Sequence, residues 1–109
     1  MRDLIDVRGA SGAVYRFNLV GESRPLSPMG GNYLYVREDG DGYEIVHVGE
    51  TENLMAAART DWAEAVQMRG AGHLFTRLNI SERVRQQEHE DIVQAAGAPP
   101  SQSASEVED

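Results

Sequence analysis

Two short apolar runs separated by a turn constrain the fold of this chain more than any other feature. Residues 31–36 and 43–49 are rich in β-branched and aromatic side chains, and residues 38–42 read Glu-Asp-Gly-Asp-Gly. Acidic residues and glycines of this kind are typical of a turn between two strands. The pattern predicts a β-hairpin over residues 31–49, and the remaining elements must cover the faces of its sheet.

The alternation of side chains in this hairpin predicts which residues share a face. With a five-residue turn, we expect Tyr33 to lie opposite His47. The same register places Tyr35 opposite Ile45. Opposed residues of an antiparallel pair point to the same side of the sheet, so Tyr33 and His47 are expected to lie side by side. The other face is expected to be aliphatic and to carry Leu34, Val36, Val46 and Val48.

The residues before this hairpin predict a second one. Residues 4–8 and 13–20 are strand-like and flank the turn sequence Gly-Ala-Ser-Gly at residues 9–12. We expect this N-terminal hairpin to extend or cover the edge of the central sheet. The alternative is that it binds a partner.

The residues after the central hairpin alternate between helix and strand. Thr51 is expected to cap a helix that ends near Gln67. Trp62 lies on the apolar stripe of this helix, which favours a place in the core over stacking against a nucleic-acid base. Residues 73–79 predict a strand, and Ser81 is expected to cap a second helix.

These elements predict an α+β domain with a β-β-α-β-α core and an added N-terminal hairpin. The single domain is expected to span residues 1–96, with the added hairpin at residues 1–20 and the core at residues 31–96. Residues 97–109 are acidic and rich in proline and serine, which is typical of a disordered tail. No apolar run approaches about 18 residues, so we expect no membrane association and a cytoplasmic location.

A motif in the central hairpin is specific enough to indicate a family. Gly-Asn-Tyr at residues 31–33 is followed by His-Val-Gly at residues 47–49, and Thr51, Asn53 and Leu54 come next. This order resembles the GIY-YIG nuclease superfamily, in which Gly-Ile-Tyr and Tyr-Ile-Gly lie on a hairpin and x-Thr-x-Asn-Leu opens a helix. The resemblance implies motif roles for four residues, Gly31, Gly49, Thr51 and Asn53.

The resemblance also implies a catalytic site. Proteins of this family cleave phosphodiester bonds with a tyrosine or another base, a metal-bound glutamate and an arginine that braces the phosphate. Tyr33 matches the first family tyrosine, and His47 stands where the second is expected. Glu88 resembles the glutamate and would hold Mg²⁺ or Mn²⁺. The alternative for Glu88 is an ion pair with Arg59 or Arg77.

The family arginine has no direct counterpart here, because Ala57 occupies its position. Arg59 lies about 200° around a helix from that position, and Arg37 lies on the strand that carries Tyr33. Either arginine is a candidate for the phosphate brace. Loss of the brace would remove much of the transition-state stabilisation that phosphodiester cleavage requires.

The distribution of charge limits contact with nucleic acid. The net charge is −8, and all ten cationic side chains are arginines. Such a balance disfavours nonspecific binding to a phosphate backbone. Only residues 59–87 are mildly basic, with five arginines and three acids. A nucleic-acid-binding patch in this segment would use Arg69, Arg77, Arg83 and Arg85.

Together these features predict a GIY-YIG-like domain that has lost catalysis and binds DNA or a protein partner. The arginine missing at Ala57 and the acidic balance favour this interpretation. The alternative is an active DNA endonuclease that depends on Mg²⁺ or Mn²⁺. Cleavage that disappears when Glu88 is replaced would distinguish the two hypotheses.

Overall fold

The computed structural model describes residues 1–21 and 24–96, so the predicted disordered tail at residues 97–109 lies outside the described residues. The chain forms an α+β domain, as expected from its sequence. Its elements in chain order are β1 (Leu4–Arg8), β2 (Val14–Val20), β3 (Gly31–Asp39), β4 (Gly42–Thr51), α1 (Leu54–Ala57), α2 (Trp62–Arg69), β5 (His73–Leu78) and α3 (Glu82–Ala95).

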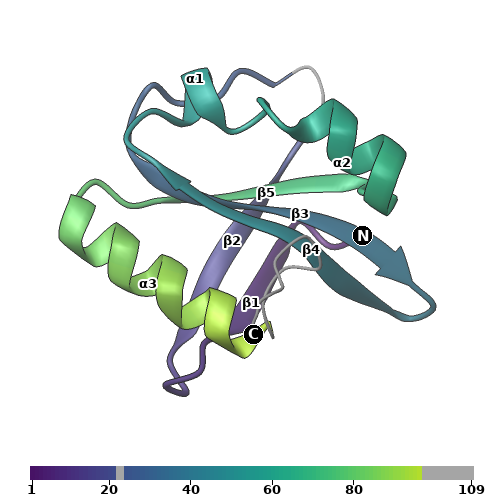
Figure 1. The fold of residues 1–109 in the computed structure, drawn as a ribbon, viewed down its shortest axis with the longest axis horizontal. Coiled ribbons are helices and arrows are strands. Elements are labelled where there is room, and N and C mark those ends of the chain that lie inside the picture. Colours follow the sequence, from purple (N-terminus) through teal and green to yellow (C-terminus); the bar gives the residue numbers. More distant parts are fainter. Residues whose placement is uncertain (22–23, 97–109) are drawn as a thin grey trace, which may run out of the picture.

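The five strands make one antiparallel sheet in the order β1-β2-β5-β3-β4. Helices α1 and α2 cover one face of the sheet, and α3 covers the other (Figure 1). Helix α3 also contacts both edge strands, β1 and β4. None of the helices in the described part of the chain is long and apolar enough to cross a membrane.

The N-terminal hairpin extends the central sheet, which confirms the expectation from its sequence. Strand β2 pairs with β5 from Asn18, opposite Thr76, to Val20, opposite Leu74. Strand β5 in turn pairs with β3. Strand β5 therefore lies between the two hairpins and joins them into one sheet, although it follows both of them in the sequence (Figure 1).

The register of the central hairpin differs from the expected one. Tyr33 lies opposite Gly49, and Tyr35 lies opposite His47. The turn contains only two residues, because Asp39 pairs with Gly42, so the strands are longer than their apolar runs. A β-bulge at Val46 then shifts the pairing by one residue.

Because of the bulge, the expected division of side chains between the two faces is wrong for Val46. Val46 packs beside Tyr33 and Tyr35, whereas Leu34, Val36 and Val48 pack on the other side of the sheet. Tyr33 and His47 do share a face, as expected, with ring centroids 5.9 Å apart. They are diagonal rather than direct neighbours.

The helix expected after Thr51 is interrupted. Asn53, not Thr51, caps α1, and its side chain accepts a hydrogen bond from the Ala56 N–H at 3.1 Å. In a continuous helix the Ala58 carbonyl would accept from the Trp62 N–H. That carbonyl instead accepts from the Tyr35 hydroxyl at 2.7 Å, and the Trp62 N–H turns to the carbonyl of Arg59. The chain therefore forms two helices with a break at residues 58–61.

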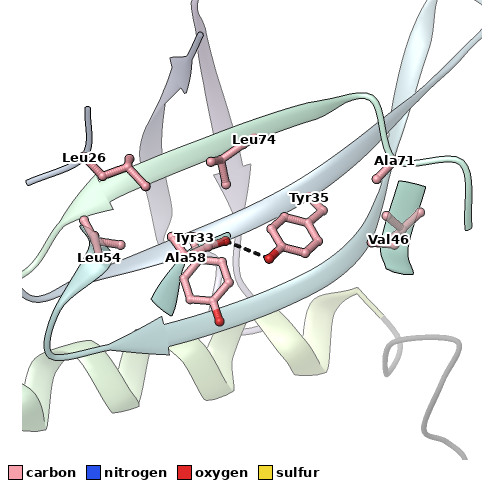
Figure 2. Close-up of a cluster of buried hydrophobic side chains, with 9 residues drawn as sticks. Leu26, Tyr33, Tyr35, Val46, Leu54, Ala58, Ala71 and Leu74 are labelled. Atoms are coloured by element: carbon pink, nitrogen blue, oxygen red, sulfur yellow. Dashed lines mark hydrogen bonds between the residues drawn. The ribbon is translucent and has the colours of Figure 1, made fainter. Parts of the chain in front are cut away.

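The apolar core has two parts, one on each face of the sheet. The part under α1 and α2, shown in Figure 2, contains Leu26, Tyr33, Tyr35, Val46, Leu54, Ala58, Ala65, Ala71 and Leu74. The part under α3 contains Ile5, Val7, Phe17, Leu34, Val36, Val48, Phe75 and Ile92. Trp62 packs partly buried against the first part, in agreement with its expected place in the core.

Candidate functional site

Three stacked or tilted rings lie under α2, and they include both candidate bases. His47 stacks on Tyr35 with centroids 4.6 Å apart and lies 5.9 Å from the ring of Tyr33. Trp62 meets Tyr35 at a near right angle, with centroids 5.1 Å apart. Such offset and edge-on arrangements are the favourable geometries of aromatic pairs.

Two motif glycines permit this arrangement. The Tyr33 ring lies directly over Gly49, where an added Cβ would come within 2.2 Å of the ring. Gly31 lies so close to the carbonyl of Arg77 and to the Leu54 side chain that a Cβ there would clash with both. The motif residues Gly31 and Gly49 are therefore explained by close packing alone.

The other two motif residues shape the end of β4. The Thr51 hydroxyl accepts a hydrogen bond from the Asn53 N–H at 3.1 Å, which orients Asn53. The Asn53 side chain then caps α1. Both side chains therefore position the start of α1.

Burial sets the protonation of the two candidate bases. It raises the pKa of the Tyr33 hydroxyl, with a further contribution from the nearby carboxylates of Asp61 and Glu50. It lowers the pKa of His47, and the charge of Arg69 acts in the same direction. Near neutral pH, Tyr33 is a neutral phenol and His47 is a neutral imidazole that can accept a proton.

The same burial predicts that stability falls in mild acid. His47 and His89 both have a pKa below the ordinary value of 6.5, mainly because of burial. A depressed pKa in the folded state means that stability is complete above the unfolded value and is lost as the pH falls toward the folded value. We expect the free energy of unfolding to decrease from about pH 7.5 to about pH 5.5. Urea unfolding at each pH measures this.

The His47→Asn/His89→Asn double variant provides the comparison for this prediction. It should show a flatter pH dependence over the same range, because it lacks both groups that take up protons on unfolding. The carboxylates of Asp6 and Asp91 titrate lower, since hydrogen bonds depress their pKa values below 3.8. If the free energy of unfolding of the double variant depended on pH as steeply as that of the wild type, the pH dependence could not be due to His47 and His89.

Glu88 lies away from the aromatic rings, in a polar network under α3. Its Oε1 accepts from Arg77 Nε and from Asn79 Nδ2, both at 2.9 Å. Asn79 also donates to Asn32 Oδ1 at 2.9 Å. The ion pair between Glu88 and Arg77, one of the two alternatives from the sequence, is thus present. Since α3 and α2 cover opposite faces, the sheet separates Glu88 from His47 (Figure 1).

Arg85 is the centre of the same network and is only 4% exposed. Its Nε donates to Glu50 Oε1 at 2.7 Å, and its Nη1 donates to the carbonyls of Asn79 and Ile80. The backbone carbonyl of Arg85 accepts from the fully buried amide of Asn32 at 3.0 Å. Arg85 therefore joins α3 to β4 and to the segment after β5.

The two arginines proposed for the phosphate brace are held elsewhere. Arg37 pairs with Glu44 across the hairpin and donates to the carbonyl of Arg69. Arg59 donates through Nη2 to the carbonyls of Gly21 and Arg24. Each of these arginines thus fastens its own part of the backbone.

The four arginines proposed for nucleic-acid binding do not form one patch. Arg69 ends α2 on one face of the sheet, whereas Arg83 and Arg85 lie on α3 on the other face (Figure 1). Arg85 is buried, and Arg77 is bound to Glu88. Of the four, Arg83 is the most exposed, and it lies on the outer side of α3.

The buried network was not predicted from the sequence, although it left a signal. Asn32 is the second residue of the largely apolar strand β3 and is fully buried, where a polar side chain needs a partner. Arg85, Glu88 and Ile92 recur at helical spacing, and they form the inner side of α3. Val84 also recurs at helical spacing with Glu88 and Ile92 in the sequence, but the structure shows it to be exposed.

A metal-binding cluster is not evident in the described residues 1–21 and 24–96, where no group of three or more His, Cys, Asp or Glu side chains converges. Comparison of the chain with protein-family models, with curated proteins and with solved structures finds no match in any of the three. The function must therefore be argued from the residues themselves.

Proposed function

We propose that this protein is a noncatalytic binding module with a GIY-YIG-like architecture, and that its partner is a protein. The observation that carries the proposal is the state of Glu88. Its carboxylate is bound to Arg77 and Asn79 and is only 14% exposed, on the face of the sheet opposite His47. A nuclease of this type needs the carboxylate free for a metal and close to the base.

The surroundings of Glu88 do not fit Mg²⁺ or Mn²⁺. Hard divalent ions require several oxygen ligands. Both oxygens of Glu88 face the guanidinium of Arg77, at 2.9 and 3.5 Å, and the amide nitrogen of Asn79 occupies a further position. A metal ion at this position would have to displace the guanidinium of Arg77, which already neutralises the carboxylate.

A protein partner fits the charge better than a nucleic acid. The net charge is −8, and the arginines that would bind phosphate are divided between two faces or paired internally. Electrostatic attraction then favours a basic partner. We therefore propose that the partner is a basic protein rather than DNA.

An active endonuclease is the second candidate, and one observation favours it. The neutral imidazole of His47 lies beside the hydroxyl-bearing ring of Tyr33, which is a workable pair for proton transfer. This hypothesis requires Glu88 to leave Arg77 when substrate and metal bind.

The Glu88→Gln variant tests the two candidates against each other. In a binding module Glu88 is structural, so we expect its replacement to lower the free energy of unfolding by about 1–3 kcal/mol, because Arg77 loses its counter-charge. Wild-type protein and variant should both leave supercoiled plasmid intact in Mg²⁺ or Mn²⁺. Chemical denaturation and a nicking assay measure the two effects.

Glu90→Gln is the matched control, because Glu90 is exposed on the same helix. It should change stability by less than about 0.5 kcal/mol. Metal-dependent nicking by wild-type protein that Glu88→Gln abolishes would overturn the proposal. Salt-sensitive binding of DNA without cleavage would support a noncatalytic binding module, but one whose partner is nucleic acid and not a protein.

A further inference from the structure

A group of exposed apolar side chains lies at the end of the sheet where β3 begins and β5 ends. The group comes from three segments of the chain, residues 27–30, 51–55 and 78–82. Its four members are between 48% and 59% exposed, and they are Met29, Met55, Leu78 and Ile80. We call them the apolar end patch. Single apolar residues on a surface are ordinary, whereas adjacent ones mark interaction sites, so the placement of these four decides their meaning.

The pairing of β3 with β5 continues beyond both strands and sets three of the four side by side. The Asn79 N–H donates to the carbonyl of Gly30 at 2.9 Å, in the register of the strands. The same register places Met29 opposite Ile80. Opposed residues share a side of a sheet, and so do residues two apart on one strand. Met29, Leu78 and Ile80 are therefore placed on the same side.

Helix α1 brings the fourth member to this side. The Leu54 N–H donates to the carbonyl of Met29 at 2.9 Å, and the next N–H, of Met55, also bonds to this segment at 3.0 Å. A Cβ at Gly31 would touch the Leu54 side chain, so α1 covers the side to which the partner of Gly31, Leu78, also points. The patch thus joins the start of α1 to the end of β5.

The backbone at this end of the sheet is already engaged on both sides. Residues 27–30 are bonded to the start of α1 on one side and to the residue after β5 on the other. A partner therefore binds through its side chains, as an amphipathic helix does when it lays its apolar face on an apolar surface. Two of the four patch residues are methionines, whose flexible side chains adapt well to such a face.

The charges next to the patch are carboxylates. The three segments contain two acidic side chains and no cationic one. These are Glu52, beside α1, and Glu82, in the first turn of α3, and both are exposed. The neighbouring Arg77 and Arg85 are each paired with a carboxylate, and Arg83 lies on the outer side of α3. The patch is therefore flanked on both sides by negative charge.

We infer that the apolar end patch docks a basic amphipathic helix of the protein partner. The apolar stripe of that helix packs on the four patch residues. Lysines or arginines on either side of the stripe lie near Glu52 and Glu82, with their aliphatic stems on the patch. This inference rests on the proposed function, because it names the surface that the basic protein partner occupies.

A synthetic helix is the probe, and methionine signals report where it binds. The peptide has about 14 residues, or four turns, with leucine at helical spacing and lysine elsewhere. A matched peptide carries glutamate in place of lysine. In the full chain, the ε-methyl NMR signals of Met29 and Met55 should show saturable shifts, while that of Met68, exposed on α2, stays unchanged. The glutamate peptide should bind about fivefold or more weakly.

Polar substitutions test the apolar part of the patch. The Leu78→Gln/Ile80→Gln variant should weaken binding of the lysine peptide about tenfold or more, because it removes apolar contact at the centre of the interface. Val66→Gln is the matched control, since Val66 is exposed on α2, away from the patch. It should change binding by less than about twofold. Urea unfolding verifies that each variant is folded.

Charge substitutions test the two flanks. Glu52→Gln/Glu82→Gln should weaken binding of the lysine peptide about fivefold and reduce its dependence on salt. Glu64→Gln/Glu90→Gln changes the net charge by the same amount at two exposed positions elsewhere on the domain. It should change binding by less than about twofold, because it leaves the flanks of the patch intact.

Four results would overturn the inference. The first is the absence of saturable shifts at Met29 and Met55, and the second is equal binding of the glutamate peptide. The third is full binding by the folded Leu78→Gln/Ile80→Gln variant. The fourth is self-association in sedimentation that this variant abolishes, which would assign the patch to a second copy of the chain. The proposed function fails on different results, namely plasmid nicking or DNA binding, so the two can be told apart.

Discussion

Replacement of Arg85 by methionine is expected to lower the free energy of unfolding by about 3 kcal/mol, because it breaks a buried ion pair on one side only. Arg85 is 4% exposed, and its guanidinium binds Glu50 and two backbone carbonyls. Methionine retains the apolar part of the side chain but leaves these acceptors without their donor. Glu50 is about a quarter exposed and regains some water, so the loss lies at the low end of the range for such pairs.

Arg83→Met is the matched control for this prediction. Arg83 lies two residues earlier on α3 and is exposed, so its replacement should change stability by less than about 0.5 kcal/mol. Guanidinium chloride unfolding followed by circular dichroism compares the two variants. Equal stabilities would show that the network around Arg85 does not hold α3 to the sheet.

Replacement of Tyr35 by alanine is expected to be more damaging, with a loss of about 4 kcal/mol. The Tyr35 ring is fully buried and contacts the rings of Tyr33, His47 and Trp62. Its removal leaves a cavity between the sheet and α2. The hydroxyl group also holds the carbonyl of Ala58 at the break between the helices.

Tyr35→Phe separates the ring from the hydroxyl. It keeps the packing but leaves the Ala58 carbonyl without the donor that Tyr35 supplies, so a loss of about 1 kcal/mol is expected. Thermal unfolding of the two variants at one pH gives the comparison. A loss in Tyr35→Phe as large as that in Tyr35→Ala would mean that the hydroxyl, and not the packing of the ring, dominates.

The features that could be predicted from the sequence are those with a local cause. The turn at Gly40 and the alternation around it predict the central hairpin, and Ser81 predicts the start of α3, where its hydroxyl accepts from the Val84 N–H. The shared face of Tyr33 and His47 follows from the same local pattern.

The features that could not be predicted depend on residues far apart in the sequence. The helix is broken at residues 58–61 where a hydroxyl from β3, 23 positions earlier, takes the carbonyl of Ala58. Asn32 is satisfied by the backbone of Arg85, 53 positions later. Helix periodicity and capping rules describe neighbours within a few residues, so neither pairing leaves a direct mark on the sequence.

The order of the strands has a consequence for how molecules of this protein meet one another. The sheet ends at β1 and β4, and an unpaired strand edge is a template on which further strands can assemble. Strand β1 is only five residues long, and its exposed Asp6 forms an ion pair with Arg16 of the neighbouring strand β2. The other end strand, β4, is ten residues long, and α3 contacts both end strands. The added hairpin thus replaces the apolar edge of β5 by a short, charged one that resists fibre-like growth.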